Sequence, residues 1–230
     1  MKLMSFNTQH CMNFITREID FEVMAAAINK LNPDIVGLNE MFDDGPAEEY
    51  TNQAQELSMR TGLKYYYFAE ALNEDGNPYG NAILSRYPII SAETIHIPDP
   101  NPKTGNRYYE TRGMLKVKLE NGYTVLVSHF GLNTDEQANG VKTAIENMEK
   151  EKTILMGDFN CKPNDSVLNP LRELMKDTAD LFEKELLSYP SNNPEMKIDY
   201  IFVTRDVEII SADIPEIIAS DHRPHIAEIG

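Results

Sequence analysis

Short extended segments that end in polar side chains recur along this sequence, and the segment around residue 157 shows the pattern most fully. Residues 153–156 form a mainly apolar run, which is typical of a buried strand. Gly157 then allows a sharp turn. In extended chain Asp158 and Asn160 share one face, while Phe159 points to the other. A strand that ends in an ordinary turn also explains this segment, because Asp and Asn are common in turns.

The alternation of such segments with helical patterns predicts the fold class. Around a dozen short strands with helices between them favour a two-sheet sandwich flanked by helices, although periodicity does not determine the strand order. We expect strands at residues 2–6, 34–38, 64–69, 80–85, 89–97, 110–119, 123–128, 153–158, 198–204, 207–211 and 225–229, and helices at 21–31, 47–60, 135–150 and 167–175.

Turn residues predict how some of these elements are joined. Asn121-Gly122 is a strong two-residue turn signal, so 110–119 and 123–128 are expected to form a hairpin. Segment 207–211 is expected to pair with 198–204 across Arg205-Asp206. No repeat, low-complexity tract or linker divides the chain. We therefore expect a single domain over residues 1–230.

The composition limits the possible classes of protein. The chain has 230 residues, of which 41% are hydrophobic, and this is enough for one domain with a substantial core. No run approaches the ~18 apolar residues of a membrane helix. The apolar stretch at the N-terminus is too short, and polar residues follow it too early, for a signal peptide. The two cysteines give no disulfide framework. A cytoplasmic protein without membrane insertion is expected.

The charge of the chain bears on its substrate. Asp and Glu total 37 against 21 Lys and Arg, which gives a net charge of −16. Nucleic-acid-binding proteins usually carry a basic surface that neutralises phosphates, and no such cluster is present. The acidity disfavours a polynucleotide substrate without excluding it, because a bound divalent cation can supply positive charge locally.

Six polar groups lie at or just beyond the expected strand ends. Each has a structural explanation when taken singly, such as a turn residue, a solvated acid or a core histidine. Together they combine hard oxygen ligands for a divalent cation with phosphate donors and two histidines that titrate near neutral pH. The groups are Asn7, Glu40, His129, the Asp158/Asn160 pair, Asp199 and the Asp221-His222 pair.

Several other chemistries lack their motifs. The chain has no Cys/His spacing for zinc, no glycine-rich phosphate loop and no Gly-x-Ser-x-Gly nucleophile motif. Oxygen ligands without thiolates favour Mg²⁺ or Mn²⁺ as the cofactor.

The order of these residues resembles the endonuclease/exonuclease/phosphatase superfamily. That group includes pancreatic deoxyribonuclease, abasic-site endonucleases, neutral sphingomyelinases and inositol polyphosphate 5-phosphatases. The resemblance rests on Gly157-Asp158-Phe159-Asn160 followed by Ser220-Asp221-His222, and it runs from Asn7 to His222. Asn39 stands where glutamine is frequent in the family, and the chain is short for the group.

The resemblance implies an α/β (α+β) fold, a four-layer α/β/β/α sandwich with two central mixed β-sheets. It also implies that Glu40 is the main Mg²⁺ ligand, with Asn7 and Asp221 nearby. Asp158 would orient or deprotonate the attacking water, and Asn160 would hold a phosphoryl oxygen.

The remaining roles also follow from the resemblance. His222, steered by Asp199, would contact the phosphate, and His129 would bind phosphate or assist the leaving group from the opposite side. Arg112 would face the substrate. Whether Asp158 or the Asp199/His222 pair is the general base stays open. Cys11 and Cys161 each follow a site residue closely, so unreactive thiols near the rim of the site are expected.

The leading functional hypothesis is a Mg²⁺-dependent phosphodiesterase or phosphatase that cleaves a small or lipid-like phosphate ester by in-line attack of water. The alternative is an endo- or exonuclease of the same fold. A non-catalytic binding module is a third hypothesis, although every expected catalytic position holds a competent residue.

Overall fold

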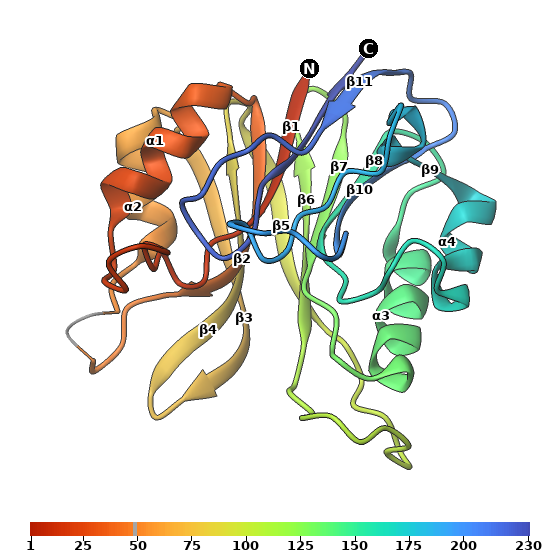
Figure 1. The fold of residues 1–230 in the computed structure, drawn as a ribbon, viewed down its shortest axis with the longest axis horizontal. Helices are drawn as coiled ribbons and strands as arrows, with labels where there is room; N and C mark the ends of the chain where they lie inside the picture. Colours follow the sequence, from red (N-terminus) through yellow and green to blue (C-terminus); the bar gives the residue numbers. More distant parts are fainter. Residues whose placement is uncertain (48–49) are drawn as a thin grey trace.

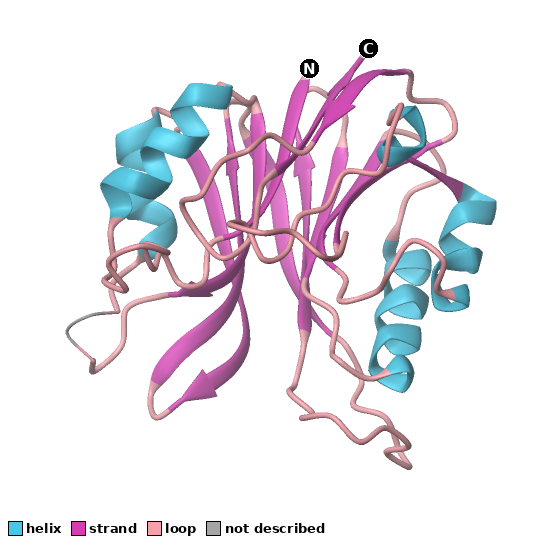
Figure 2. Cartoon of the chain, viewed as in Figure 1, coloured by secondary structure: helices cyan, strands magenta, loops and turns pink. Residues whose placement is uncertain are grey.

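The computed structural model describes residues 1–47 and 50–230 and shows two β-sheets packed face to face, with helices outside them (Figures 1 and 2). The first sheet contains β1 (Lys2–Asn7), β2 (Ile35–Phe42), β3 (Tyr65–Glu74), β4 (Asn77–Ser85), β11 (Ile209–Asp213) and β12 (His225–Ile229). The second contains β5 (Ile89–His96), β6 (Gly113–Leu119), β7 (Thr124–Ser128), β8 (Thr153–Asp158), β9 (Met175–Asp177) and β10 (Asp199–Thr204). The strand orders are β11-β12-β1-β2-β4-β3 and β5-β6-β7-β8-β10-β9.

Helices cover the outer face of each sheet. Within the described residues, α1 (Phe21–Leu31) and α2 (Gln53–Thr61) lie on the first sheet, and α3 (Thr134–Asn147) and α4 (Asn169–Leu174) lie on the second (Figure 1). Asp20 begins α1 by accepting a hydrogen bond from the Val23 N–H, and Asn32 ends it in the left-handed conformation. The predicted four-layer α/β/β/α sandwich with two mixed sheets is confirmed.

Three apolar clusters fill the spaces between the four layers. One lies between the sheets, one under α1 and α2, and one under α3 and α4. In β8, Ile154 and Met156 belong to the cluster between the sheets, while Leu155 belongs to the cluster under α3 and α4. The continuous apolar run of this strand follows from its burial on both faces.

The strand directions bring the polar strand ends together. β1 runs parallel to β2, and β7 runs parallel to β8. Their carboxyl ends lie toward the end of the molecule that carries the turn between β3 and β4, at the bottom of Figure 1. Residues that follow these strands can therefore meet at one rim of the sandwich.

The expected pairing of 207–211 with 198–204 is wrong. β11 pairs antiparallel with β12 in the first sheet, whereas β10 belongs to the second. Since β10 already has β8 on one side and β9 on the other, neither of its edges is free. The turn at Arg205-Asp206 instead leads the chain from one sheet to the other.

Other element boundaries differ from the predictions. The helix expected at 47–60 begins at Gln53, because Asn52 caps it by accepting a hydrogen bond from Gln55 N–H, and Gly62 ends it in the left-handed region. Residues 48–49 of that prediction lie outside the described part. At 167–175 the chain forms a 3₁₀ turn (Ser166–Leu168) followed by α4, and then β9 pairs with β10. The hairpin across Asn121-Gly122 is confirmed, although its first strand begins at Gly113.

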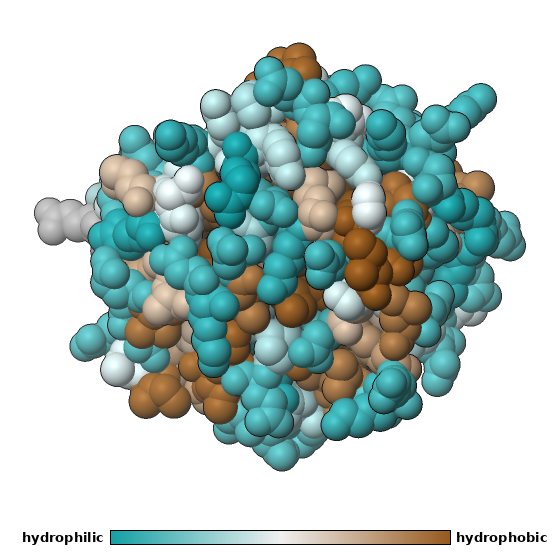
Figure 3. Space-filling model, turned by 90° about the horizontal axis from the view of Figure 1, so that it is seen from above, coloured by the Kyte–Doolittle hydropathy of each residue, from teal (hydrophilic) through white to brown (hydrophobic). Residues whose placement is uncertain are grey.

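The face that carries the chain termini is mostly hydrophilic, with smaller apolar groups (Figure 3). Among the helices described, none combines the length and apolar character needed to cross a membrane.

Candidate active site

The two sheets are joined at the rim by the side chain of Asn7, the last residue of β1. Its Nδ2 donates to Glu40 Oε1 at 2.9 Å and to Asp158 Oδ2 at 3.2 Å. Glu40 belongs to β2 in the first sheet, and Asp158 ends β8 in the second. The structure thus brings together three residues that the sequence separates widely.

A β-bulge orients Glu40. Leu38 pairs with Ala82 and Met41 with Gly80, so Asn39 and Glu40 both lie opposite one residue of β4. Glu40 has a φ of 57°, a left-handed conformation that is uncommon for glutamate. The prediction that the strand ends at Asn39-Glu40 is corrected, because β2 continues through the bulge to Phe42.

Asp158 lies between two histidines. It is 2% exposed, and its Oδ2 is 3.5 Å from His129 Nε2 and 3.6 Å from His222 Nε2. Asp199, which faces Asp158 across the β8–β10 pair, holds His222 Nδ1 at 2.9 Å through its Oδ2. The expected Asp199–His222 pair is therefore present, with its free imidazole nitrogen toward Asp158.

The two histidines experience opposite electrostatic environments. Burial by itself lowers the pKa of His222, but the charges of Asp199 and Asp158 outweigh it and raise the pKa above its ordinary value. The pKa of His129 lies well below its ordinary value. Burial is the largest cause, and the positive charges of Arg112 and His222 add to it. Burial raises the pKa of Asp158, partly offset by His222. The raised pKa favours the charged form of His222, and the lowered pKa favours the neutral form of His129.

Hydrogen-bond donors face both nitrogens of the buried His129 ring. Arg112 Nη1 lies 3.0 Å from Nδ1, and Asn160 Nδ2 lies 3.0 Å from Nε2. A neutral imidazole has one acceptor nitrogen and accepts from one of these two donors, whereas a protonated ring accepts from neither, so the arrangement adds to the effect of burial in disfavouring the charged ring. Arg112 also pairs with Glu110 at 2.6 Å.

Asn160 reaches the site through a turn rather than an extended strand. Its φ is 50°, and its main-chain N–H donates to Asp158 Oδ1 at 2.9 Å. The expected strict alternation of faces therefore ends at Phe159. That ring packs outward against Phe130, as predicted, at a centroid distance of 4.3 Å.

Asp221 lies in the loop before β12, where its Oδ1 accepts a hydrogen bond from Ser220 Oγ at 3.0 Å. Its charge acts on Glu40: burial raises the pKa of Glu40, the hydrogen bond from Asn7 lowers it, and Asp221 raises it further. The two carboxylates thus lie close enough to repel each other.

The concentration of carboxylates fits a divalent cation. Asp158, Asp199 and His222 have atoms that all lie within 4.8 Å of one another, but Asp199 already holds His222 Nδ1, so this group forms an acid–imidazole pair. The two neighbouring carboxylates of Glu40 and Asp221 are the feature that suits a cation. Asp199 Oδ1 is buried, and no hydrogen-bond partner exists for it among the described residues. Hard oxygen donors of this kind suit Mg²⁺ or Mn²⁺. Asn7 presents its amide nitrogen to the carboxylates, since its Oδ1 accepts from Gln9 N–H at 3.0 Å.

Sequence reasoning missed the role of Asn39, which it treated only as a departure from a family pattern. Asn39 is fully buried and connects the sheets through Asn81 on one side and Ser128 and Asp158 on the other. The one feature of the sequence that could have indicated this role is that a polar residue stands directly before Glu40, within an otherwise apolar strand.

Both thiols are enclosed by the protein rather than exposed at the rim. Cys11 and Cys161 are free and fully buried. Burial raises the pKa of both thiols, that of Cys11 to about 12. This agrees with the expectation that they are unreactive.

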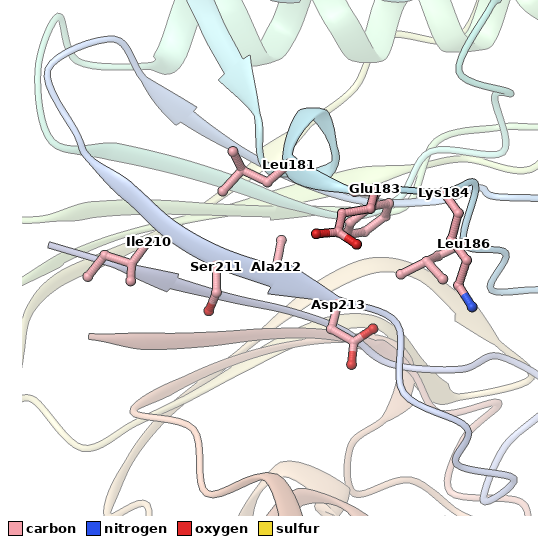
Figure 4. Close-up of a pocket in the computed structure, with 9 residues that line it drawn as sticks. Leu181, Glu183, Lys184, Leu186, Ile210, Ser211, Ala212 and Asp213 are labelled. Carbon is pink, nitrogen blue, oxygen red and sulfur yellow. The ribbon is translucent and has the colours of Figure 1, made fainter.

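A pocket of about 710 Å³ lies apart from these residues. Side chains of the 181–186 segment and of the edge strand β11 face each other across it, including Leu181, Ile210 and Asp213 (Figure 4). None of the expected site residues lines it.

Known proteins share this architecture. None of the curated proteins matches the chain in sequence. An endonuclease/exonuclease/phosphatase structure from Beutenbergia cavernae DSM 12333 is 20% identical with a TM-score of 0.81, covering 100% of this chain and 71% of that one. A mannosyl-6-phosphatase from Bacteroides thetaiotaomicron VPI-5482 is 15% identical with a TM-score of 0.76, covering 100% and 99%. Truncated TDP2 from Caenorhabditis elegans is 17% identical with a TM-score of 0.64, covering 98% and 95%.

At these identities the structures establish the fold alone. The sequence is more specific, because the family model described as "Endonuclease/Exonuclease/phosphatase family" matches residues 4–222. This span includes Asn7, Glu40, Asp158 and His222, which the fold places at one rim. The chain therefore belongs to the endonuclease/exonuclease/phosphatase family.

Proposed function

We propose that this protein is a divalent-metal-dependent phosphoesterase that hydrolyses a small phosphate ester by in-line attack of water. Members of its family are hydrolases that act on phosphoester bonds. The observation that carries the proposal is the position of Asp158, whose buried carboxylate contacts His129, His222 and Asn7 at once. A carboxylate between two imidazoles can hold and deprotonate a water.

Asp158 acts as the base in this proposal. Burial raises its pKa, which makes the carboxylate a better proton acceptor than an exposed aspartate. His222 carries the proton that Asp199 and Asp158 stabilise, so it donates a hydrogen bond from Nε2 and stabilises negative charge on the phosphoryl oxygens.

The opposite side of the phosphate contacts neutral and cationic donors. Asn160 Nδ2 and the His129 ring bind a phosphoryl oxygen, and Arg112 adds positive charge behind the ring. These donors are held in place before the substrate binds, so little reorganisation is needed in the transition state.

Glu40 and Asp221 would hold Mg²⁺ or Mn²⁺ in this proposal, with Asn7 beside them. The mutual repulsion of the two carboxylates is relieved by a cation. When bound, the ion neutralises the charge of the phosphate ester and of the leaving oxygen.

A small substrate, or a lipid headgroup, is favoured over a polynucleotide. The net charge of −16 opposes a long polyanion. One structural neighbour is a mannosyl-6-phosphatase, which acts on a small phosphate ester.

The test compares bis(p-nitrophenyl) phosphate and p-nitrophenyl phosphate with supercoiled plasmid, each with Mg²⁺ and with EDTA. We expect EDTA-sensitive release of p-nitrophenol and little nicking. Asp158→Asn abolishes the release, whereas Asp213→Asn, at an exposed strand position, retains it. Release of p-nitrophenol that survives EDTA or Asp158→Asn contradicts the proposal. Robust, EDTA-sensitive nicking of the plasmid would instead identify the protein as a nuclease.

A further inference from the structure

A second pocket, of about 360 Å³, meets the candidate site at one residue, Asn160. Asn160 lines it, and the same side chain contacts His129 Nε2. A group bound to the phosphate at Asn160 can therefore extend directly into this pocket. Its volume is at the lower end of the range for small-molecule sites.

Two cations line this pocket in a chain that is otherwise strongly acidic. Arg107 and Lys162 are both exposed, and neither forms an ion pair with any acid in residues 1–47 or 50–230. Asp165 is the acidic residue of the lining. Its Oδ2 accepts a hydrogen bond from the Lys162 main-chain N–H at 2.7 Å. The lining thus holds two positive charges and one negative charge.

The backbone that carries these cations is fixed. Arg107 N–H donates to Asn133 Oδ1 at 2.9 Å, and Asn133 Nδ2 donates to the Arg107 carbonyl at 3.3 Å. Asn133 precedes α3, so a stable helix anchors this part of the loop. On the other side, buried Gln137 donates to the Asn160 carbonyl at 2.9 Å.

We propose that this pocket is a subsite for a second anionic group, a carboxylate or a phosphate, on the leaving group of the substrate, and that Arg107 and Lys162 bind it. The inference rests on the proposed phosphoesterase function and specifies its substrate class. Two cations on an anchored backbone beside a site for phosphate select a small molecule that carries a second anionic group besides the phosphate, because a neutral leaving group leaves them without a partner.

The test uses two aryl phosphates of matched size, 4-carboxyphenyl phosphate and its neutral amide, 4-carbamoylphenyl phosphate. A third probe, 4-(phosphonomethyl)phenyl phosphate, distinguishes a phosphate-like anion from a carboxylate. We expect kcat/KM to be about tenfold higher for an anionic probe than for the amide, mainly through KM. Arg107→Ala and Lys162→Ala each reduce this preference, and the double variant removes it.

The control is Lys64→Ala, which removes an exposed positive charge before β3 at a distance from the pocket, and it keeps the preference. Equal kcat/KM for all three probes in the wild-type protein overturns the subsite, as does a preference that survives in the double variant. Both outcomes leave the phosphoesterase function intact. A failure of that function is recognised separately, by the absence of EDTA-sensitive hydrolysis of any probe.

Discussion

Asn39 Oδ1 accepts a hydrogen bond from the main-chain N–H of Asp158 at 3.0 Å, and this contact joins the two sheets at the point where the candidate base lies. The Nδ2 of the same side chain donates to Asn81 Oδ1 at 2.7 Å and to the Ser128 carbonyl at 3.0 Å. All of these groups are buried. Asn39 therefore determines where the end of β8 lies relative to β2.

We expect Asn39→Ala to reduce the free energy of unfolding by about 3 kcal/mol, because it leaves several buried polar groups without partners. Urea denaturation measures the change. Asn29→Ala is the matched control, since it removes an exposed hydrogen bond to the Arg60 carbonyl and costs less than about 1 kcal/mol. Equal losses of unfolding free energy in the two variants would show that the buried contact between the sheets stabilises the fold no more than an exposed hydrogen bond does.

Asp199→Asn tests how His222 is held. The change removes the negative charge 2.9 Å from His222 Nδ1, so the pKa of His222 falls. We expect kcat to decrease roughly 10²- to 10⁴-fold with a small change in KM. NMR titration of the imidazole measures the pKa. A variant with reduced kcat but an unshifted His222 pKa would indicate a structural role for Asp199 instead.

Gly157→Ala tests the tight approach of β8 to β7. Gly157 has a φ of 146°, and a Cβ there would lie 1.8 Å from the Ser128 carbonyl oxygen. We expect a loss of more than about 3 kcal/mol, measured by denaturant unfolding.

Gly122→Ala is the control for backbone strain alone. Gly122 also has a positive φ, 89°, but nothing lies within 4 Å of the added Cβ. Its expected cost is about 1 kcal/mol. Similar costs at positions 122 and 157 would mean that β8 moves to relieve the contact.

We expect the buried side chain of His225 to make the fold less stable in acid. It is fully buried between Thr178 Oγ1 and the Asp199 carbonyl, and burial, reinforced by Lys197, lowers its pKa to about 3. Between this value and the ordinary pKa of 6.5, the unfolded chain binds a proton that the folded chain excludes. The contribution of His225 to stability is therefore present above pH 6.5 and decreases as the pH falls toward 3.

In His225→Gln the unfolded chain no longer binds this extra proton. The slope of the free energy of unfolding against pH should therefore decrease by up to about 1.4 kcal/mol per pH unit. Unfolding curves between pH 4 and pH 7 measure the slope. His96→Gln, at an exposed position in β5, should leave it as in the wild type. An unchanged slope for His225→Gln would show that the buried ring accepts a proton without cost.

Much of the fold and of the candidate site followed from local patterns in the sequence. Apolar runs with polar ends predicted most strands, and Asn121-Gly122 predicted a hairpin, because strand burial and turn chemistry act over a few residues. The family resemblance implied that Asn7, Glu40, Asp158 and His222 act in one site. In the structure Asn7 bonds to Glu40 and Asp158, and Asp158 Oδ2 lies 3.6 Å from His222 Nε2.

Other features were decided only by contacts between distant segments. β11 joined the first sheet because both edges of β10 were already paired, which no local pattern reveals. The opposite pKa shifts of His129 and His222 depend on burial and on neighbours from other segments. The sequence by itself determined which polar residues make up the candidate site. The tertiary structure decided their protonation, their orientation and the adjoining cationic pocket, because electrostatic energies and packing depend on distances that the chain sets only when it folds.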